Sequence, residues 1–280
     1  MNRRNFMLGS AAFLAGCSRA DDPANDAMTE SAPLGLQLYT VRELMAEDVA
    51  ATLALVAGVG YREVEFAGYF GLTPDAVRRL LAGEGLTAPS AHIGYGDFVL
   101  DVDRVIEHAA AVGHRFIVVP AVPDDQRATL DDYRRHAENF NRWSEACAAA
   151  GLRFAYHNHM FEFDEIDGRQ PYDLLLSETD AGRVEMELDL AWAHGGNADP
   201  IVLFDAWPGR FPMFHVKDLD ENRDEVDIGD GDVAFARILE HASRAGLEHG
   251  FIERDHAADV RNSIKQNFDA ILPLWTEFVQ

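Results

Sequence analysis

The sequence predicts an α/β protein folded as a single (β/α)8 TIM barrel, and three observations support this. Short apolar segments alternate with helical patterns eight times from residue 34 onward. Strands that alternate with helices pair in parallel through right-handed crossovers, and eight such units fit a barrel of about 250 residues. No Gly-rich phosphate-binding turn follows the early strands, which argues against a dinucleotide-binding sheet. An open, doubly wound sheet is the alternative.

The eight expected strands are short and mostly apolar, and seven of them end in ionisable or amide side chains. Parallel strands buried on both faces should be almost wholly apolar, so polar groups at their ends indicate a common site. The expected strands cover Leu34–Tyr39, Glu63–Phe66, Ala88–His92, Phe116–Pro120, Arg153–His157, Val184–Leu188, Met213–Lys217 and Gly250–Glu253.

The segments between these strands show helical periodicity and helix end signals. Pro74 stands in the first turn of a helix that begins at Thr73. Gly151 is the end signal of a different helix, the one expected over Asp131–Ala150. The other expected helices cover Glu43–Gly58, Asp101–Gly113, Asp131–Ala150, Tyr172–Ser177, Pro200–Trp207, Asp232–Ala245 and Ser263–Phe278.

The N-terminus has the pattern of an export signal. Arg3 and Arg4 precede a short apolar run that ends in Leu-Ala-Gly-Cys at Cys17. This run is too short for a membrane-spanning helix. The paired arginines resemble a twin-arginine signal, and the last four residues resemble a lipobox, whose cleavage leaves a lipid on Cys17. We therefore expect a signal peptide over residues 1–16, a flexible tether over 17–33 and a barrel over 34–280. A buried N-terminal helix is the alternative.

Net charge and cysteine content limit the classes of partner that the protein is expected to bind. The formal net charge of −24 disfavours binding to nucleic acid or to anionic lipid, so contact with a membrane is expected only through the lipid on Cys17. With Cys17 lipidated, Cys147 is the remaining cysteine, and we expect it to be a thiol in the core rather than part of a disulfide framework. The expected location is the periplasm, and a homo-oligomer is an open alternative to a monomer.

The polar strand ends should meet at one rim, because active sites of such barrels lie at the C-terminal ends of the strands. Carboxylates and imidazoles from separate strands suit one divalent ion such as Mn, Co, Zn or Mg, whereas the lack of a thiolate disfavours a structural zinc site. The polar residues at these ends are Gln37, Tyr39, Glu65, His92, His157, Asn158, His159, Glu187, Asp189, His215, Lys217, Glu253 and Asp255.

Several stretches around these residues form a set of motifs along most of the chain: GLQLYTVR (35–42), GYREVEFAGYFG (60–71), YHNHMFEF (156–163), MELDLAWAHGGNADP (186–200), FHVKDLD (214–220) and FIERD (251–255). In this order they resemble the sugar phosphate isomerase/epimerase superfamily, the xylose isomerase-like barrels. The resemblance implies one divalent ion held by ligands from strands five to eight. Asp189, His215 and Glu253 match the last three of these positions.

The resemblance also implies substrate contacts. Glu65 and His92 match positions that usually touch the substrate. Lys217 lies two residues beyond His215 on the same strand face and is expected to bind a substrate oxygen, with a rim salt bridge as the alternative. The remaining expected substrate contacts are Asn158, His159 and Trp192.

Strand five departs from the family pattern. His157 stands where the family usually has a carboxylate, so either His157 is the fourth ligand or Glu162 curls back to supply it. The usual pair of carboxylates on opposite faces of the sugar then becomes His157 and Glu253, which is still a workable acid/base couple. The lost symmetry disfavours simple epimerisation and favours elimination or hydration.

These observations lead to three functional hypotheses. The first is a metal-dependent isomerase or epimerase that abstracts a proton beside a carbonyl, with Glu253 or His157 as base. The second is a lyase or hydratase that acts on a 3-keto-glycoside or dehydrates a keto-sugar. The third is an inactive, lipid-anchored sugar-binding protein.

The substrate is expected to be a non-phosphorylated sugar. Sugar phosphates are scarce outside the cytoplasm, and the later strand ends carry no Arg cluster or Gly-rich loop that could bind a phosphate. Aromatic residues near the rim could stack on a sugar ring or cover a subunit contact. They are Tyr39, Phe66, Tyr69 and Trp192.

Overall fold

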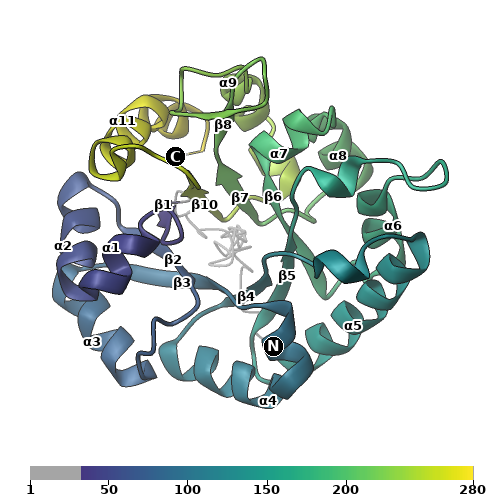
Figure 1. The fold of residues 1–280 in the computed structure, drawn as a ribbon, viewed down its shortest axis with the longest axis horizontal. Helices are drawn as coiled ribbons and strands as arrows, with labels where there is room; N and C mark the ends of the chain where they lie inside the picture. Colours follow the sequence, from purple (N-terminus) through teal and green to yellow (C-terminus); the bar gives the residue numbers. More distant parts are fainter. Residues whose placement is uncertain (1–32, 280) are drawn as a thin grey trace, which may run out of the picture. The chain divides into compact units, whose positions relative to one another are not determined.

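A computed structural model describes residues 33–279 and confirms the predicted barrel. Eight parallel strands close into a ring in the order β1-β10-β7-β6-β5-β4-β3-β2, and the helices surround this ring (Figure 1). The predicted signal peptide and tether lie outside the described residues, except for Pro33. Among residues 33–279, no helix combines the length and the hydrophobicity that a membrane-spanning segment requires.

The observed strands match the expected ones to within about two residues at each end. They are β1 (Leu34–Gln37), β2 (Glu63–Ala67), β3 (Thr87–His92), β4 (Phe116–Val119), β5 (Arg153–His157), β6 (Val184–Asp189), β7 (Met213–Val216) and β10 (His249–Ile252). A further hairpin, β8 (Asp218–Leu219) with β9 (Glu225–Val226), follows β7 and was not predicted.

Three expected helices differ from the observed ones for local reasons. The helix over Glu43–Gly58 is divided at Asp48, whose extended backbone and side-chain bond to the amide of Ala51 start a new helix. The helix expected from Asp101 begins earlier, at Tyr95, and is kinked at Asp101. The segment Asp232–Ala245 forms two short helices rather than one.

The observed helices alternate with the strands as expected for a barrel. They are α1 (Arg42–Glu47), α2 (Val49–Val59), α3 (Pro74–Glu84), α4 (Tyr95–Val112), α5 (Leu130–Ala149), α6 (Pro171–Glu178), α7 (Leu190–Gly195), α8 (Pro200–Ala206), α9 (Phe235–Leu239), α10 (Ala242–Ala245) and α11 (Val260–Phe278), with 3-10 turns at Asp124–Gln126 and Phe161–Phe163.

The apolar core has two parts. The larger part packs between the strands and the surrounding helices and includes Cys147, which is a buried free thiol as predicted. The smaller part fills the barrel interior and consists of Phe116, Val118, Ala155, Met213 and Phe251. On β5, β7 and β10 the next residues on the same strand faces are His157, His215 and Glu253, so on these strands the interior changes from apolar to polar along the barrel axis.

Candidate active site

The polar site is assembled by the period-two alternation of the strands. Residues two apart on a strand point to the same side of the sheet, so the side chains that follow the inner apolar layer also point into the barrel. On β5 the apolar Ala155 is followed, two residues later, by the polar His157, and on β7 Met213 is followed in the same way by His215. Eight inward side chains of this kind are buried together: Gln37, Glu65, Ser90, His92, His157, Glu187, His215 and Glu253.

Two carboxylates, Glu65 and Glu187, lie deepest in this polar layer and share two histidines. His92 Nε2 lies 2.5 Å from Glu187 Oε2 and 3.3 Å from Glu65 Oε2. His215 Nε2 lies 2.8 Å from Glu65 Oε2 and 3.2 Å from Glu187 Oε2. Gln37 adds a hydrogen bond of 2.7 Å to Glu65.

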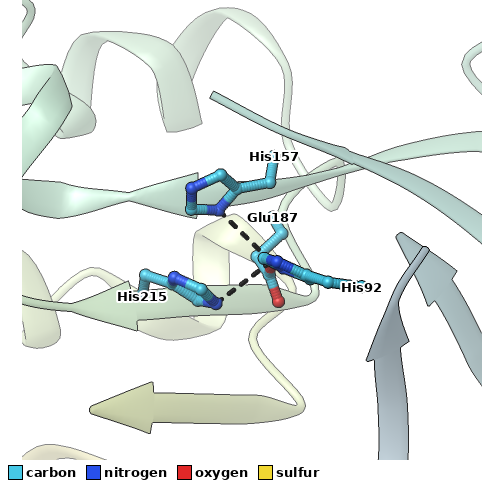
Figure 2. A group of neighbouring side chains, drawn as sticks. All are labelled: His92, His157, Glu187 and His215. Carbon is cyan, nitrogen blue, oxygen red and sulfur yellow. Dashed lines mark hydrogen bonds and ion pairs between the residues drawn. The ribbon is translucent and has the colours of Figure 1, made fainter. Parts of the chain in front are cut away.

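The two carboxylates differ in acidity. Burial, together with the neighbouring Glu187, raises the pKa of Glu65. Burial also opposes ionisation of Glu187, but His215 and His92 outweigh it and hold the pKa of Glu187 well below its usual value. The lower pKa of Glu187 follows because that carboxylate faces three histidines (Figure 2). Glu187 is therefore the more acidic of these two carboxylates.

Nearer the C-terminal ends of the strands, a second group of four residues matches the metal set implied by the sequence. One ligand atom each from His157, Asp189, His215 and Glu253 lie within 4.8 Å of one another, and all four residues are buried. His215 turns its Nδ1 toward Glu253 Oε2 at 2.9 Å, while its Nε2 faces Glu65. A histidine that binds metal through one ring nitrogen commonly donates the N–H of its other ring nitrogen to a carboxylate, which fixes its orientation and tautomer.

Two hydrogen bonds hold Asp189 in place and leave its second carboxylate oxygen without a hydrogen-bond donor. It caps α7 by accepting the amide of Trp192 at 2.8 Å, and its own amide donates to Asn158 Oδ1 at 3.0 Å. Its other oxygen, Oδ2, is buried without a hydrogen-bond partner, and the Lys217 ammonium lies 3.6 Å from it. Such atoms are rare in protein interiors, and a cation would satisfy this one. The group of His157, Asp189, His215 and Glu253 therefore fits a divalent ion.

The acidities of this group also suit ligands. Burial raises the pKa of Asp189 to about 7. Burial opposes ionisation of Glu253, but Lys217 and His215 outweigh it and hold its pKa well below the usual value. Burial and the neighbouring His215 lower the pKa of His157, so this imidazole is uncharged at neutral pH. An uncharged imidazole is the form that binds metal.

Lys217 is buried among four carboxylates beside this group. Its Nζ lies 2.9 Å from both Glu253 Oε2 and Asp255 Oδ2, 3.1 Å from Glu225 Oε1 and 3.6 Å from Asp189 Oδ2. It also lies 4.7 Å from the ring centre of Trp192. Burial alone would lower the pKa of Lys217, but these carboxylates raise it well above its usual value, so the ammonium persists at neutral pH.

The structure places the two candidate ligands from strand five differently. His157 belongs to the four-residue group, whereas Glu162 does not. The Glu162 carboxylate lies in a buried pocket of its own, where it accepts hydrogen bonds from the Tyr156 hydroxyl and, at 2.8 Å, from the His159 amide. Burial raises the pKa of Glu162 to about 8.

A cavity of about 890 Å³ opens at the C-terminal ends of the strands, above these groups. Of the residues expected to touch substrate, His92 and His159 line it, and the expected base Glu253 does so too. Glu65 is fully buried in the polar layer, and Asn158 is fully buried against Asp189. Among the rim aromatics, Tyr39 and Tyr69 line the cavity, whereas Phe66 is buried in the core and does not face it.

Sequence reasoning noted Glu187 but assigned it no role, and it missed Glu225 altogether. Glu187 lies two residues before Asp189 on the same strand, so the alternation rule could have placed both side chains inside the barrel. Glu225 comes from the unpredicted β8–β9 hairpin and reaches Lys217 only through tertiary structure.

The chain resembles known proteins in both sequence and fold. The family model described as "Xylose isomerase-like TIM barrel" matches residues 53–265. No curated protein matches the chain significantly. A sugar phosphate isomerase/epimerase from Parabacteroides distasonis superimposes with a TM-score of 0.77 at 25% identity, covering 92% of this chain and all of that one.

Two more distant structures share the fold. An L-ribulose 3-epimerase superimposes with a TM-score of 0.66 at 16% identity, covering 88% of this chain and 95% of that one. The probable 3-DHS dehydratase AsbF from Bacillus anthracis gives 0.69 at 11% identity, covering 86% and 98%. Together with the barrel and its buried His, Asp and Glu cluster, the family match shows that this chain belongs to the xylose isomerase-like TIM barrel family.

Proposed function

We propose that the protein is a divalent-metal-dependent isomerase or epimerase acting on a non-phosphorylated sugar or keto-sugar. The observation that carries this proposal is the buried group of His157, Asp189, His215 and Glu253 next to a cavity that His157 and Glu253 also line. If these residues act as ligands and base, they would stand beside the space where a sugar would lie. The family and the Parabacteroides structure support the same class of reaction.

In this reaction Glu253, Lys217 and His157 have different roles. A bound ion would polarise the sugar carbonyl and stabilise the charge that develops on its oxygen. Glu253 is ionised because Lys217 and His215 lower its pKa, so it can accept a proton from the carbon beside that carbonyl. Lys217 keeps Glu253 oriented through a contact of 2.9 Å. His157, uncharged and at the cavity wall, is the other proton acceptor within reach.

The cavity wall favours a substrate without phosphate. Among the described residues that line the cavity, Arg104 is the single arginine, and no lysine is present. The Arg104 guanidinium is mostly exposed and lies 3.8 Å from Asp97. Phosphate sites normally combine several arginines or a lysine with a helix N-terminus. The N-terminus of α4 lines the cavity at Gly94, but Asp97 places a carboxylate in its first turn, which disfavours a bound phosphate.

A lyase or hydratase is the second candidate, and the cavity favours it. Beyond His157 and Glu253 the cavity continues along Tyr69, Leu72 and Val105, which leaves room for a group attached to the sugar. The same proton abstraction would then be followed by loss of the oxygen substituent on the neighbouring carbon. The different chemistry of His157 and Glu253 also suits elimination better than a symmetric epimerisation.

The deciding experiment uses metal-loaded protein, heavy water and a panel of free sugars, 3-keto-sugars and 3-keto-glycosides, with mass spectrometry of the products. We expect deuterium to enter beside the carbonyl while the sugar keeps its skeleton. Release of water or an aglycone would show that the protein is a lyase or hydratase rather than an isomerase or epimerase. The Glu253→Gln variant controls for exchange that does not need the base. Sugar binding without exchange or release would contradict both reactions and indicate a binding protein.

We further propose that the protein is exported and held at the membrane by a lipid on Cys17. This proposal is supported by the paired arginines and the Leu-Ala-Gly-Cys motif, which lie outside the described residues. In cell fractionation, Cys17→Ser should move the protein from the membrane to the soluble fraction. Cys147→Ser, a change at the buried cysteine, should leave it on the membrane. Membrane partitioning of Cys17→Ser would contradict the proposal.

A further inference from the structure

We propose that the barrel interior contains a second, deeper cation position formed by His92, His157, Glu187 and His215, which favours zinc-like ions. One ligand atom from each of these buried residues lies within 4.8 Å of the others. Figure 2 shows the three imidazoles converging on the Glu187 carboxylate. This group shares His157 and His215 with the group at the strand ends but replaces Asp189 and Glu253 by His92 and Glu187.

The spacing of the ligand atoms suits a four-coordinate ion. His215 Nε2 and His157 Nδ1 lie 3.2 and 3.3 Å from Glu187 Oε2. Nitrogen and oxygen ligands stand about 2.0–2.1 Å from zinc, so neighbouring ligand atoms of a tetrahedral site are about 3.3 Å apart. His92 Nε2 is closer to Glu187, at 2.5 Å, and would need to move outward slightly to share an ion.

Two atoms of this group have no hydrogen-bond partner. Glu187 Oε1 and His157 Nδ1 are both buried and unsatisfied. His157 Nδ1 faces Glu187 Oε2 at 3.3 Å without forming a hydrogen bond to it. A polar atom left without a partner destabilises a protein interior, because it has lost its hydrogen bonds to water. A cation beside Glu187 Oε2 would become the partner of His157 Nδ1, and an ion bound by both carboxylate oxygens would satisfy Oε1 as well.

The donor set determines which ion this position prefers. Three imidazoles and one carboxylate favour Zn²⁺ or Co²⁺, whereas Mg²⁺ and Ca²⁺ prefer oxygen ligands. The group at the strand ends has two carboxylates and two imidazoles, so it accepts Mn²⁺ or Mg²⁺ more readily. The two positions therefore differ in selectivity although they share half of their ligands.

Sharing makes the two positions mutually exclusive. A neutral imidazole has one lone pair in its ring plane and can bind one ion. His215 turns Nε2 toward Glu187 and Nδ1 toward Glu253, so its tautomer decides which position it serves. We expect each chain to bind one ion at a time. Zinc should occupy the position deep in the barrel, and manganese, when it is bound instead, the position at the strand ends. Added zinc should displace manganese one for one.

The test locates the ion directly and does not depend on turnover. Crystals of the zinc-loaded protein are measured at the zinc absorption edge, and zinc and manganese affinities are determined by chelator competition. We expect an anomalous peak within ligand distance of His92 and Glu187. Glu187→Gln should weaken zinc binding at least tenfold and manganese binding less. Asp189→Asn, a matched loss of one carboxylate at the other position, should show the opposite preference.

The possible contrary results are distinct. A zinc peak between Asp189 and Glu253 would overturn the deep position but leave the proposed function intact. Density beside Glu187 without an anomalous signal would identify a water molecule and would also overturn it. Two zinc ions per chain would contradict the mutual exclusion. If Glu187→Gln does not fold, as judged by circular dichroism, the anomalous map of the unaltered protein decides alone.

Discussion

At the scale of single residues, the site owes its properties to charges buried in a confined space. Lys217 and the histidines offset several carboxylates that would otherwise be strongly destabilising inside a barrel. Asp189 is the exception, because burial raises its pKa to about 7 and one of its oxygens has no hydrogen-bond partner. An ion that binds Asp189 must therefore displace a proton when the pH is below about 7.

This reasoning leads to a prediction for metal binding. Asp189→Asn or His215→Ala should reduce affinity for manganese at least about tenfold, because each change removes a ligand from a closely spaced set. In the unaltered protein, affinity should fall as the pH decreases below about 7, where Asp189 becomes protonated. Metal analysis after dialysis and titration at several pH values provide the measurement. Unchanged metal content in either variant would show that the ion is held elsewhere.

A second residue-scale prediction concerns Glu162. Burial raises its pKa in the folded chain to about 8, above the value near 4.3 of an unfolded chain. Between these values the folded state holds a proton that the unfolded state has lost, so this group makes the free energy of unfolding decrease as the pH rises. Glu162→Gln mimics the protonated form and should be more stable than the original protein at pH 8 but not at pH 4.

Urea unfolding at the two pH values measures this difference. The same variant distinguishes between the two candidate ligands from strand five. If His157 is the ligand, Glu162→Gln should bind metal as well as the original protein does. A large loss of affinity would mean that Glu162 moves into the site when metal binds.

At the scale of elements, the β8–β9 hairpin links the site to the loop that follows it. Asp218 is buried and accepts four backbone hydrogen bonds of 3.0–3.2 Å, from the amides of Leu219, Gly229, Gly231 and Val233. This carboxylate fixes the loop that carries Glu225 to Lys217. The fixed position of Glu225 is therefore a property of the loop rather than of any local pattern.

Asp218→Asn should loosen this loop. The side-chain amide would turn an NH₂ group toward backbone amides that also donate, and each buried amide left without an acceptor costs about 1–3 kcal/mol. Hydrogen exchange should become faster over residues 219–233, and catalytic turnover should fall because Glu225 no longer supports Lys217. The control is Asp232→Asn, which makes the same change at an exposed position of the same loop. Equal exchange in both variants would contradict the role of Asp218.

At the scale of the whole molecule, closure of the barrel depends on contacts between the first and last elements. β1 pairs in parallel with β10, and α11 covers that seam. Gly250 on β10 lies against the buried indole of Trp275 on α11, and a β-carbon added to Gly250 would overlap that ring. The lack of a side chain at residue 250 lets the last helix approach the barrel closely.

Gly250→Ala should therefore reduce the free energy of unfolding by about 1–3 kcal/mol, the usual cost of overpacking a core. Gly83→Ala is the matched control. Its β-carbon would lie in open space within α3, where alanine is favoured over glycine by about 0.5–1 kcal/mol. Chemical denaturation of both variants measures the two effects. A Gly250→Ala protein as stable as the original would show that α11 can move away without cost.

The sequence alone was sufficient to predict the barrel, because its signals are local. Apolar runs, helical periodicity and end signals such as Pro74 and Gly151 each operate within a few residues. The same locality explains one error, since Asp48 competes for a backbone amide and interrupts a helix that periodicity alone would continue. At Asp101 the predicted helix start was sound, and the error was to miss the helical segment that precedes it from Tyr95. The candidate ligands could be named because strand ends and a family resemblance identify positions rather than contacts.

Tertiary structure alone decided how those positions interact. Glu65 and Glu187 stand on β2 and β6, across the barrel from each other, and only closure of the ring brings both to His92 and His215. Glu225 reaches Lys217 because a buried aspartate fixes a hairpin. Burial, which no local pattern reports, then sets the pKa values of Asp189 and Glu162. Pairing of charges across strands and their removal from water are long-range effects, and they determine the chemistry of this site.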